Sequence, residues 1–437
     1  MQKTLQLVLI RVSKVLGIGF AGALIALLLL GIFFLNQKPD LKAWHTVHLD
    51  EEFTAKSEIE SFSEYLALEE RLFTQLEEEV LSVTEKEDQH PVSRYYENSL
   101  VNPLNETQNW NRSFELPQIA GSVSPKIGVL LIHGLSDSPY SLRSIGEKLH
   151  AQGAHVLALR VPGHGTAPSG LVRTKWPDMA AAVELAMKHL HGQVGEVPLY
   201  AIGYSNGAAL SVRYALSSLD HKALPRLEGL VLISPEIGIT PAASLAVWQG
   251  RVGSVLGLDK LKWTGVALEY DPYKYSSFPV NAGDLAHRLT AANRELIQKL
   301  DAKGALEEFP RVMAFQSTVD ATVKPTAVVE DLFFHLPDRG NELVLFGLNR
   351  RVGFSPLYKI DPSVYLKALL EEPGRNFVLT GIVSATDSED TVEVHRYAMG
   401  AREPTKEATE MEWPREIYSL SHVALPFSPD DPIYGRK

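Results

Sequence analysis

The pattern of apolar and polar residues changes twice along this chain of 437 residues. Residues 15–35 contain no charge and are mostly Leu, Ile, Ala, Gly and Phe. This predicts a helix long enough to cross the roughly 30 Å hydrocarbon core of a bilayer, with a buried core helix as the alternative. Residues 36–120 then combine a helical apolar period with many glutamates, which predicts an acidic helical stalk or an N-terminal subdomain.

From about Ile127 short apolar runs alternate with amphipathic helices. This alternation predicts an α/β fold with a mostly parallel central sheet covered by helices on both faces. The expected strands are Ile127–Ile132, Val156–Leu159, Leu199–Ile202, Leu230–Ile233, Val312–Phe315 and Leu343–Phe346. The expected helices between the first four strands are Tyr140–Ala151, Pro177–His191 and Asn206–Leu216.

Two longer stretches interrupt the alternation, and each is interpreted as an insertion rather than a structureless loop. Residues 238–305 separate the fourth and fifth strands, and residues 349–414 follow the sixth. The second stretch contains strand-like runs at Phe377–Val383 and Thr391–Val394. We therefore expect residues 121–437 to form one domain with two insertions.

The net charge of −11 comes from one segment, because residues 50–88 hold fourteen acidic and three basic residues. The remainder is neutral, so nucleic acid is not an expected partner. Lys3, Arg11 and Lys14 precede the apolar helix, and the positive-inside rule therefore predicts that residues 1–14 are a cytoplasmic tail. The remaining domain would be extracytoplasmic, facing the periplasm if the source is Gram-negative. A cleaved signal peptide is the alternative, but no Ala-x-Ala-like site follows the apolar run.

The strongest chemical motif is Gly203-Tyr204-Ser205-Asn206-Gly207, which lies between a predicted strand and a predicted helix. Gly-x-Ser-x-Gly is a weak signal alone, but a nucleophile on a strand-to-helix turn needs small residues two positions away on either side. The same turn would aim the Asn206 amide at a reacting carbonyl as one oxyanion donor.

His133-Gly134 after the first strand, Pro162-Gly163-His164-Gly165 and Gly203-x-Ser205-x-Gly207 together resemble the α/β-hydrolase superfamily, especially bacterial carboxylesterases and monoacylglycerol lipase-like members. The resemblance implies the α/β-hydrolase fold with a cap at 238–305. It also implies a second oxyanion donor at the Leu135 amide, beside the supporting His133-Gly134 loop. His164 would lie in a nearby turn.

A serine nucleophile needs a histidine base and a carboxylate, which follow it in this fold in the order acid, histidine. Asp320 is preferred as the acid, because it follows the strand Val312–Phe315 in a Ser-x-x-Asp-x-x-Val pattern like that of the family. Asp331 and Asp338 are alternatives. The resemblance likewise implies that His422 is the base, with His335 and His395 as alternatives. The 102 positions between Asp320 and His422 exceed the family's usual spacing, and the 349–414 insertion would account for them.

These residues predict a membrane-anchored serine esterase that forms an acyl-enzyme and needs no cofactor. Neither His133 nor His164 has metal-ligand spacing, and no metal site is expected. The chain has no cysteine, which excludes disulfides and thiolate sites.

The predicted membrane anchor and the apolar cap suggest acyl or lipid-like substrates such as monoacylglycerols or lysophospholipids. The alternatives are a thioesterase or peptidase with the same triad, and an inactive binding module at the membrane. The cap's apolar residues would line an acyl pocket or form the cap's own packing: Trp248, Val252, Leu256, Leu258, Leu261, Trp263, Val266, Leu268, Tyr270, Tyr273, Tyr275 and Phe278.

Overall fold

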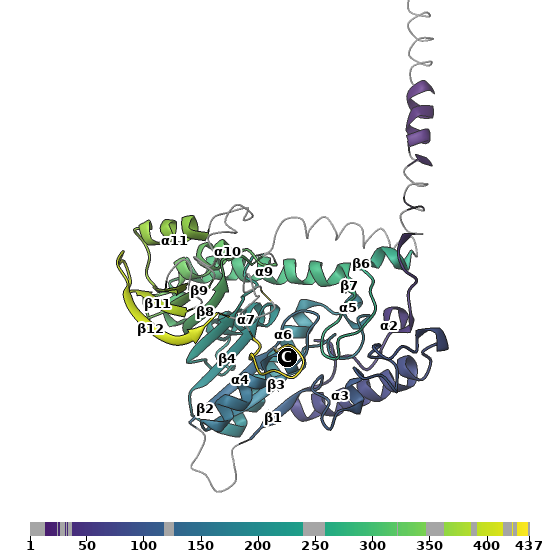
Figure 1. The fold of residues 1–437 in the computed structure, drawn as a ribbon, viewed down its shortest axis with the longest axis horizontal. Coiled ribbons are helices and arrows are strands. Elements are labelled where there is room, and N and C mark those ends of the chain that lie inside the picture. The colour runs from purple at the N-terminus through teal and green to yellow at the C-terminus, as the bar shows by residue number, and fades with distance from the viewer. Residues whose placement is uncertain are drawn as a thin grey trace, which may run out of the picture.

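A single mixed sheet organises the molecule (Figure 1). The computed structural model describes residues 14–23, 25–26, 31, 33, 37–117, 126–238, 258–320, 322–346, 362–385, 391–413, 422 and 426–435. Within these residues ten strands pair in the order β1-β3-β2-β4-β5-β8-β9-β10-β11-β12. Their bounds are β1 Phe114–Leu116, β2 Ile127–Ile132, β3 Ala154–Leu159, β4 Leu199–Tyr204, β5 Gly229–Ile233, β8 Arg311–Ser317, β9 Glu342–Phe346, β10 Val378–Ser384, β11 Thr391–Tyr397 and β12 Thr405–Glu412.

Neighbouring strands from β3 to β10 run parallel, while β1, β11 and β12 pair antiparallel to their neighbours. The six strands expected from the apolar runs are all present, and the register of β2 against β4 places Ile132 opposite Gly203. Parallel strands are buried on both faces, which is why their sequences are apolar without alternation.

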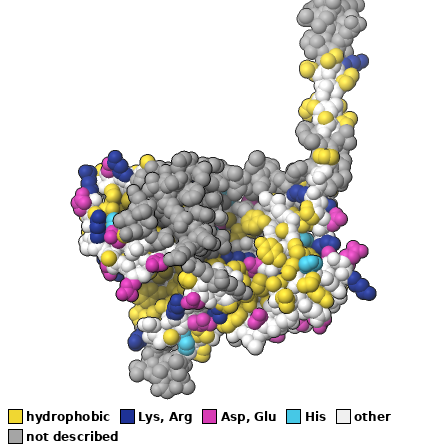
Figure 2. All heavy atoms as spheres, in the orientation of Figure 1, with side chains coloured by type: hydrophobic (Ala, Val, Ile, Leu, Met, Phe, Trp, Pro, Cys, Tyr) yellow, Lys and Arg dark blue, Asp and Glu magenta, His cyan; other side chains and the backbone are white. Residues whose placement is uncertain are grey.

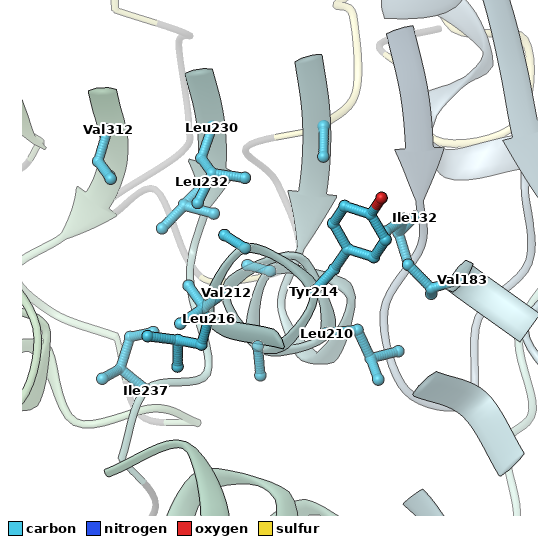
Figure 3. Close-up of a cluster of buried hydrophobic side chains, with 14 of the residues drawn as sticks. Ile132, Val183, Leu210, Val212, Tyr214, Leu216, Leu230, Leu232, Ile237 and Val312 are labelled. Atoms are coloured by element: carbon cyan, nitrogen blue, oxygen red, sulfur yellow. The ribbon is translucent and has the colours of Figure 1, made fainter. Parts of the chain in front are cut away.

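Helices cover both faces of the sheet. One face carries α6 (Trp176–Val194), α7 (Asn206–Asp220) and α9 (Val280–Asp301), whose apolar residues join Leu130 and Ile132 of β2 in the larger core cluster. Figure 3 shows α7 in this core, with Val212 and Leu216 on the side of Leu232 and with Leu210 on the side of Ile132 and Val183. The opposite face carries α4 (Tyr140–Ala151), where Leu142 packs with Val129 and Leu131. The expected helices at 140–151, 177–191 and 206–216 are thus confirmed.

The acidic N-terminal segment packs onto the body of the protein. It contains α2 (Ala43–Thr46) and α3 (Phe62–Leu76), and α3 begins with a capping box formed by Ser61 and Glu64. Phe62 and Tyr65 lie in the same core cluster as α6, and Tyr65 donates a 2.6 Å hydrogen bond to the Arg160 carbonyl. Glu64 and Glu70 of α3 face water, as expected for an amphipathic helix, whereas Glu69 is buried.

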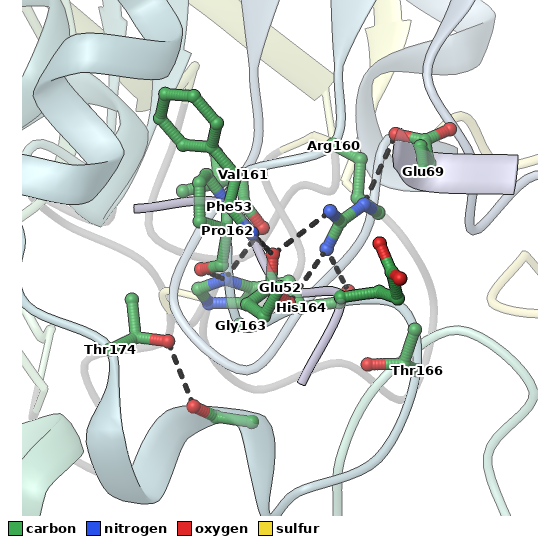
Figure 4. A network of polar contacts seen from close by, with 12 residues as sticks. Glu52, Phe53, Glu69, Arg160, Val161, Pro162, Gly163, His164, Thr166 and Thr174 are labelled. Carbon is green, nitrogen blue, oxygen red and sulfur yellow. Dashed lines mark hydrogen bonds and ion pairs between the residues drawn. The ribbon is translucent and has the colours of Figure 1, made fainter. Parts of the chain in front are cut away.

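A buried ion network joins this segment to the body (Figure 4). The Arg160 guanidinium, which is fully buried, contacts Glu69 at 3.1 Å and Glu52 at 3.0 Å. It also donates to the His164 carbonyl at 3.0 Å. The network therefore connects α3 to the Pro162-Gly163-His164-Gly165 turn.

The two expected insertions differ in role. Residues 239–257, which include Trp248, Val252 and Leu256 of the expected cap, lie outside the described residues. The later part of the 238–305 stretch forms the short strands β6 (Trp263–Gly265) and β7 (Phe278–Pro279) and then α9. Assigning this whole stretch to a cap was wrong, because Leu285, Leu289 and Ile297 of α9 are buried in the main core.

The second insertion lengthens the sheet. Its strand-like runs form β10 and β11, and β10 pairs parallel to β9. β12 was not anticipated: it pairs antiparallel to β11 and is exposed along most of its length. Three further α-helices of the described part are α5 (Gly170–Arg173), α10 (Pro325–Glu330) and α11 (Pro362–Glu371).

The predicted membrane helix at 15–35 lies partly outside the described residues. Among those that are described, no helix is both long and apolar enough to span a bilayer. The described helical residues Val15, Leu16 and Ile18 are 68–74% exposed and stand away from the body (Figure 1).

Candidate active site

Ser205 lies on a sharp turn between β4 and α7. Its backbone has φ 55° and ψ −115°, a left-handed conformation that a non-glycine residue rarely adopts. The turn is held by hydrogen bonds, because the Ser205 amide donates to the Ile233 carbonyl at 2.9 Å. The conformation leaves the Ser205 hydroxyl at the carboxyl edge of the sheet, at the N-terminus of α7.

The glycines two residues before and after Ser205 allow the backbone to pack closely. A Cβ at Gly203 would lie 2.4 Å from the Gly207 carbonyl oxygen, and one at Gly207 would lie 2.0 Å from that of Ile132. Neither position tolerates a side chain, since the obstacle is backbone. The close packing of β2, β4 and α7 thus explains the Gly-x-Ser-x-Gly spacing.

His422 and Asp320 complete a hydrogen-bonded line with Ser205. The His422 Nε2 atom is 2.9 Å from the Ser205 hydroxyl, and its Nδ1 atom is 2.8 Å from an Asp320 carboxylate oxygen. The three residues come from positions far apart in the sequence and meet at one edge of the sheet. With Nδ1 protonated, the imidazole donates to Asp320 and accepts the serine proton at Nε2.

Asp320 is held in its charged form. Burial acts to raise its pKa, but the hydrogen bond and charge of His422 and the amides of Val323 and Thr322 outweigh burial and lower the pKa below its usual value. The two amides donate to one carboxylate oxygen at 3.0 and 2.8 Å, which leaves the other oxygen for His422 and the Gln316 amide. The carboxylate is therefore fixed in orientation as well as in charge.

The His422 main chain is anchored by the core and by the C-terminal segment. Its carbonyl accepts hydrogen bonds of 3.4 Å from the Tyr204 and Ser234 hydroxyls. Beyond it, Tyr434 donates to Asp271 at 2.5 Å, and Tyr140 donates to Asp431 at 3.0 Å. Contacts of its own carbonyl and of the later C-terminal segment thus hold the histidine.

The predicted oxyanion loop lies against the serine. A Cβ at Gly134 would approach the Ser205 Cβ to 3.2 Å, so the loop backbone passes beside the nucleophile. The His133 Nε2 atom accepts from the Val161 amide at 3.0 Å, which leaves Nδ1 to donate to the Gly134 carbonyl at 2.8 Å. Burial lowers the pKa of His133 well below its usual value, so its imidazole is neutral. The loop carries Leu135 next in the chain, and Asn206 is the first residue of α7, where helix amides have no intrahelical acceptor.

His164 lies in the turn beside this loop. Its ring is 5.0 Å from that of His133, and its Nδ1 atom contacts the Pro162 carbonyl at 3.0 Å. Burial lowers the pKa of His164 to about 4, so it too is neutral. Both histidines thus support the loop, and no group of three or more potential metal ligands occurs among the described residues.

The residues considered as alternatives to Asp320 and His422 have other neighbours. Asp331 forms an ion pair with Arg294, and Asp338 follows a short helix. His335 contacts Asp301 at 2.8 Å, and His395 contacts Glu393 on β11. Each histidine alternative therefore has its own carboxylate and is not hydrogen-bonded to Ser205.

Glu236 is a buried carboxyl group that the sequence interpretation missed. It accepts a 3.1 Å hydrogen bond from the Asn206 side chain, and its amide donates to the Ser205 carbonyl at 3.2 Å. Burial raises its pKa to about 7, although Asn206 and His422 act in the opposite direction. Its place just after the strand Leu230–Ile233 was the available signal, because parallel strands bring their carboxyl ends to the same edge.

Comparisons with known proteins find similar sequences and chain traces. A family model described as serine aminopeptidase, S33 matches residues 123–332. A thermostable monoacylglycerol lipase of Bacillus sp. (strain H-257) is 30% identical over 137 residues, which are 30% of this chain and 52% of that protein. The chain thus spans about half the length of this curated relative.

Solved structures with a similar chain trace include lipolytic enzymes. A structure from work on the metagenome-derived enzymes LipS and LipT has 21% identity and a TM-score of 0.41, covering 55% of this chain and 89% of its own. A soluble variant of monoglyceride lipase from Saccharomyces cerevisiae has 17% identity and a TM-score of 0.39, covering 53% and 81%.

Proposed function

Because this chain resembles the carboxylesterases and monoacylglycerol lipases of the α/β-hydrolase superfamily, we propose that it hydrolyses carboxylic esters with Ser205 as nucleophile. The observation that carries the proposal is the line of hydrogen bonds from the Ser205 hydroxyl through His422 to Asp320. A serine hydroxyl is a poor nucleophile near neutral pH, and such a line removes its proton as it attacks.

In the proposed mechanism the Ser205 oxygen attacks the ester carbonyl while His422 Nε2 takes its proton. The negative oxygen of the tetrahedral intermediate accepts hydrogen bonds from the Leu135 and Asn206 amides. His422 then donates the proton to the leaving alcohol, which leaves an acyl group on Ser205. A water molecule attacks this acyl-enzyme as it gives its proton to His422, and the acid leaves as His422 returns that proton to the Ser205 oxygen.

A fluorophosphonate probe tests the nucleophile, because such probes phosphonylate an activated serine. We expect the full chain to be labelled and the Ser205→Ala variant not to be. Ser63→Ala is the matched control, since Ser63 is exposed on α3. Labelling of Ser205→Ala at the wild-type level would refute the proposed nucleophile, and absence of labelling in the wild type would favour an inactive binding module.

The proposed substrates are acyl esters of the lipid type, such as monoacylglycerols or lysophospholipids. Similarity to a monoacylglycerol lipase supports this class. A series of esters with acyl chains from acetyl to palmitoyl, together with matched thioesters and amides, tests it. Good turnover of acetyl esters without turnover of decanoyl and longer esters would exclude lipid-like substrates, and preference for thioesters or amides would favour the alternative activities.

We further propose that residues 15–35 anchor the protein in a membrane, with residues 1–14 cytoplasmic and the catalytic domain on the other side. The support is the charge-free sequence, the basic residues before it and the exposure of its described apolar side chains. Protease added to intact spheroplasts or right-side-out vesicles tests the orientation. Degradation of the catalytic domain is expected, whereas its full protection would place it on the cytoplasmic side.

A further inference from the structure

A small polar cavity lies away from the catalytic residues, between α2, α5 and the short helix Asp259–Lys262. Its volume is about 70 Å³, room for roughly two water molecules or one phosphate-sized group. The lining includes Ser169 and Arg173 from α5 and its N-terminal flank, Lys262, and His48. Figure 2 shows Lys or Arg, His, and Asp or Glu side chains near the point where the N-terminal segment meets the body.

The charges around the cavity are mainly positive. Arg173 forms no ion pair within the described part of the chain, so its guanidinium is available to a ligand. Lys262 is also cationic and lies 2.7 Å from Asp259, the acidic residue of the lining. Two cations against one carboxylate favour an anion over a metal cation.

A buried hydroxyl at the same cavity lacks a partner. Ser169 is 7% exposed, and its Oγ atom makes no hydrogen bond, although its amide donates to the Trp44 carbonyl. An unsatisfied buried hydroxyl costs free energy, so a ligand that accepts a hydrogen bond there is favoured. The oxygen of an anion satisfies the hydroxyl and both cations together.

The cavity adjoins the point where the chain enters the body after the apolar N-terminal segment. The Lys38 ammonium donates to the Trp263 carbonyl at 2.5 Å, and the Lys260 ammonium contacts Asp40 at 2.7 Å. These contacts tie residues 38–40 to the segment that lines the cavity. A cavity so close to a membrane-anchored segment would lie beside lipid headgroups.

We propose that this cavity binds a phosphate group, either of an anionic lipid headgroup or of free phosphate. Arg173 and Lys262 supply positive charge, and the Ser169 hydroxyl donates a hydrogen bond. The lipid source rests on the proposed membrane anchor, whereas the phosphate chemistry rests on the cavity alone. The site is separate from the Ser205 centre, so it would orient the protein at the membrane rather than take part in ester cleavage.

Titration calorimetry on the full chain in uncharged detergent tests the site with two probes, inorganic phosphate and dihexanoylphosphatidylglycerol. We expect saturable binding of at least the lipid. Arg173→Gln and Lys262→Gln should each weaken it at least about tenfold, because each removes a charge-assisted interaction. Ser169→Ala should weaken it severalfold without changing the charge, and Arg226→Gln is the control, since Arg226 is an exposed cation paired with Glu308.

The two probes separate the sources. Binding of both identifies the phosphate group itself as the ligand, and binding of the lipid alone identifies a headgroup. Absence of binding by both, or equal weakening by Arg226→Gln, would overturn the proposal. Hydrolysis of a soluble ester by the same variants should stay at the wild-type level, because the cavity is separate from Ser205. A wild-type protein that binds phosphate but hydrolyses no ester would count against the proposed function alone.

Discussion

Among single residues, Asp320 has the most clearly defined role in the candidate site. Its carboxylate is held charged by His422 and two backbone amides, and it fixes the imidazole. We expect Asp320→Asn to lower kcat by about four orders of magnitude, since a neutral amide neither fixes the required tautomer nor stabilises the imidazolium. Steady-state kinetics on a soluble ester measures this. Asp331→Asn is the control, and an Asp320→Asn enzyme within tenfold of the wild type would contradict the role.

Glu236 predicts a dependence of stability on pH. Burial raises its folded pKa to about 7, whereas glutamate in an unfolded chain has a pKa of about 4.3. The unfolded chain therefore loses its proton first, and the stability that Glu236 contributes is complete below about pH 4 and is lost as the pH rises through about 7.

We expect Glu236→Gln to gain stability relative to the wild type between about pH 5 and about pH 8, by on the order of 3 kcal/mol. Glutamine retains an oxygen that accepts from Asn206, so the hydrogen bond is kept. Urea unfolding of both proteins at the two pH values measures the difference. An unchanged difference between the two proteins would show that Glu236 ionises normally.

The site residues that could be identified from the sequence are those that lie in or beside a recognisable local motif. Ser205, Asp320 and His422 each follow or flank a recognisable run, and the structure brings all three together. Glu236 and Tyr204 were missed because their significance lies in contacts between distant segments. A buried carboxyl group is invisible in a sequence until the fold shows what surrounds it.

At the scale of elements, a glycine in α7 and a glycine in α6 predict opposite effects when each is replaced by alanine. A Cβ at Gly207 would lie 2.0 Å from a backbone oxygen of β2, while one at Gly192 of α6 would meet nothing within 4 Å. We expect Gly207→Ala to abolish soluble folded protein. Gly192→Ala should stabilise by up to about 1 kcal/mol, because alanine favours helix. Soluble yield and thermal unfolding measure both, and a stable Gly207→Ala protein would refute the packing argument.

The parallel strands were predictable because both of their faces are buried, which makes their sequences continuously apolar. The strands at the edges of the sheet were not predictable. β1 has three residues, and β12 is almost wholly exposed and has a charged sequence. Exposed edge strands carry weak apolar signals, and charge on them opposes edge-to-edge pairing. The α9 helix was hidden for another reason, since its apolar face fits either a cap or the core.

At the scale of the whole molecule, the Arg160 network joins the acidic N-terminal segment to the turn beside the active site. Removing one member of a buried ion pair leaves an uncompensated charge and costs about 3–5 kcal/mol. We expect Arg160→Met to lower the free energy of unfolding by that amount, since both Glu52 and Glu69 lose their cation. Urea unfolding measures it. Arg71→Met, which breaks an exposed pair with Glu51, should cost less than about 1 kcal/mol. Equal losses in the two variants would show that the network does not hold the segment.

The central claim is that Ser205 and His422 act as one unit. The most direct test compares ester hydrolysis by the wild type, Ser205→Ala, His422→Ala and the double variant. Groups that act together are strongly non-additive, so we predict that each single variant loses several orders of magnitude in kcat and that the double variant loses little more. Substantial activity in His422→Ala, or losses that multiply in the double variant, would contradict the account.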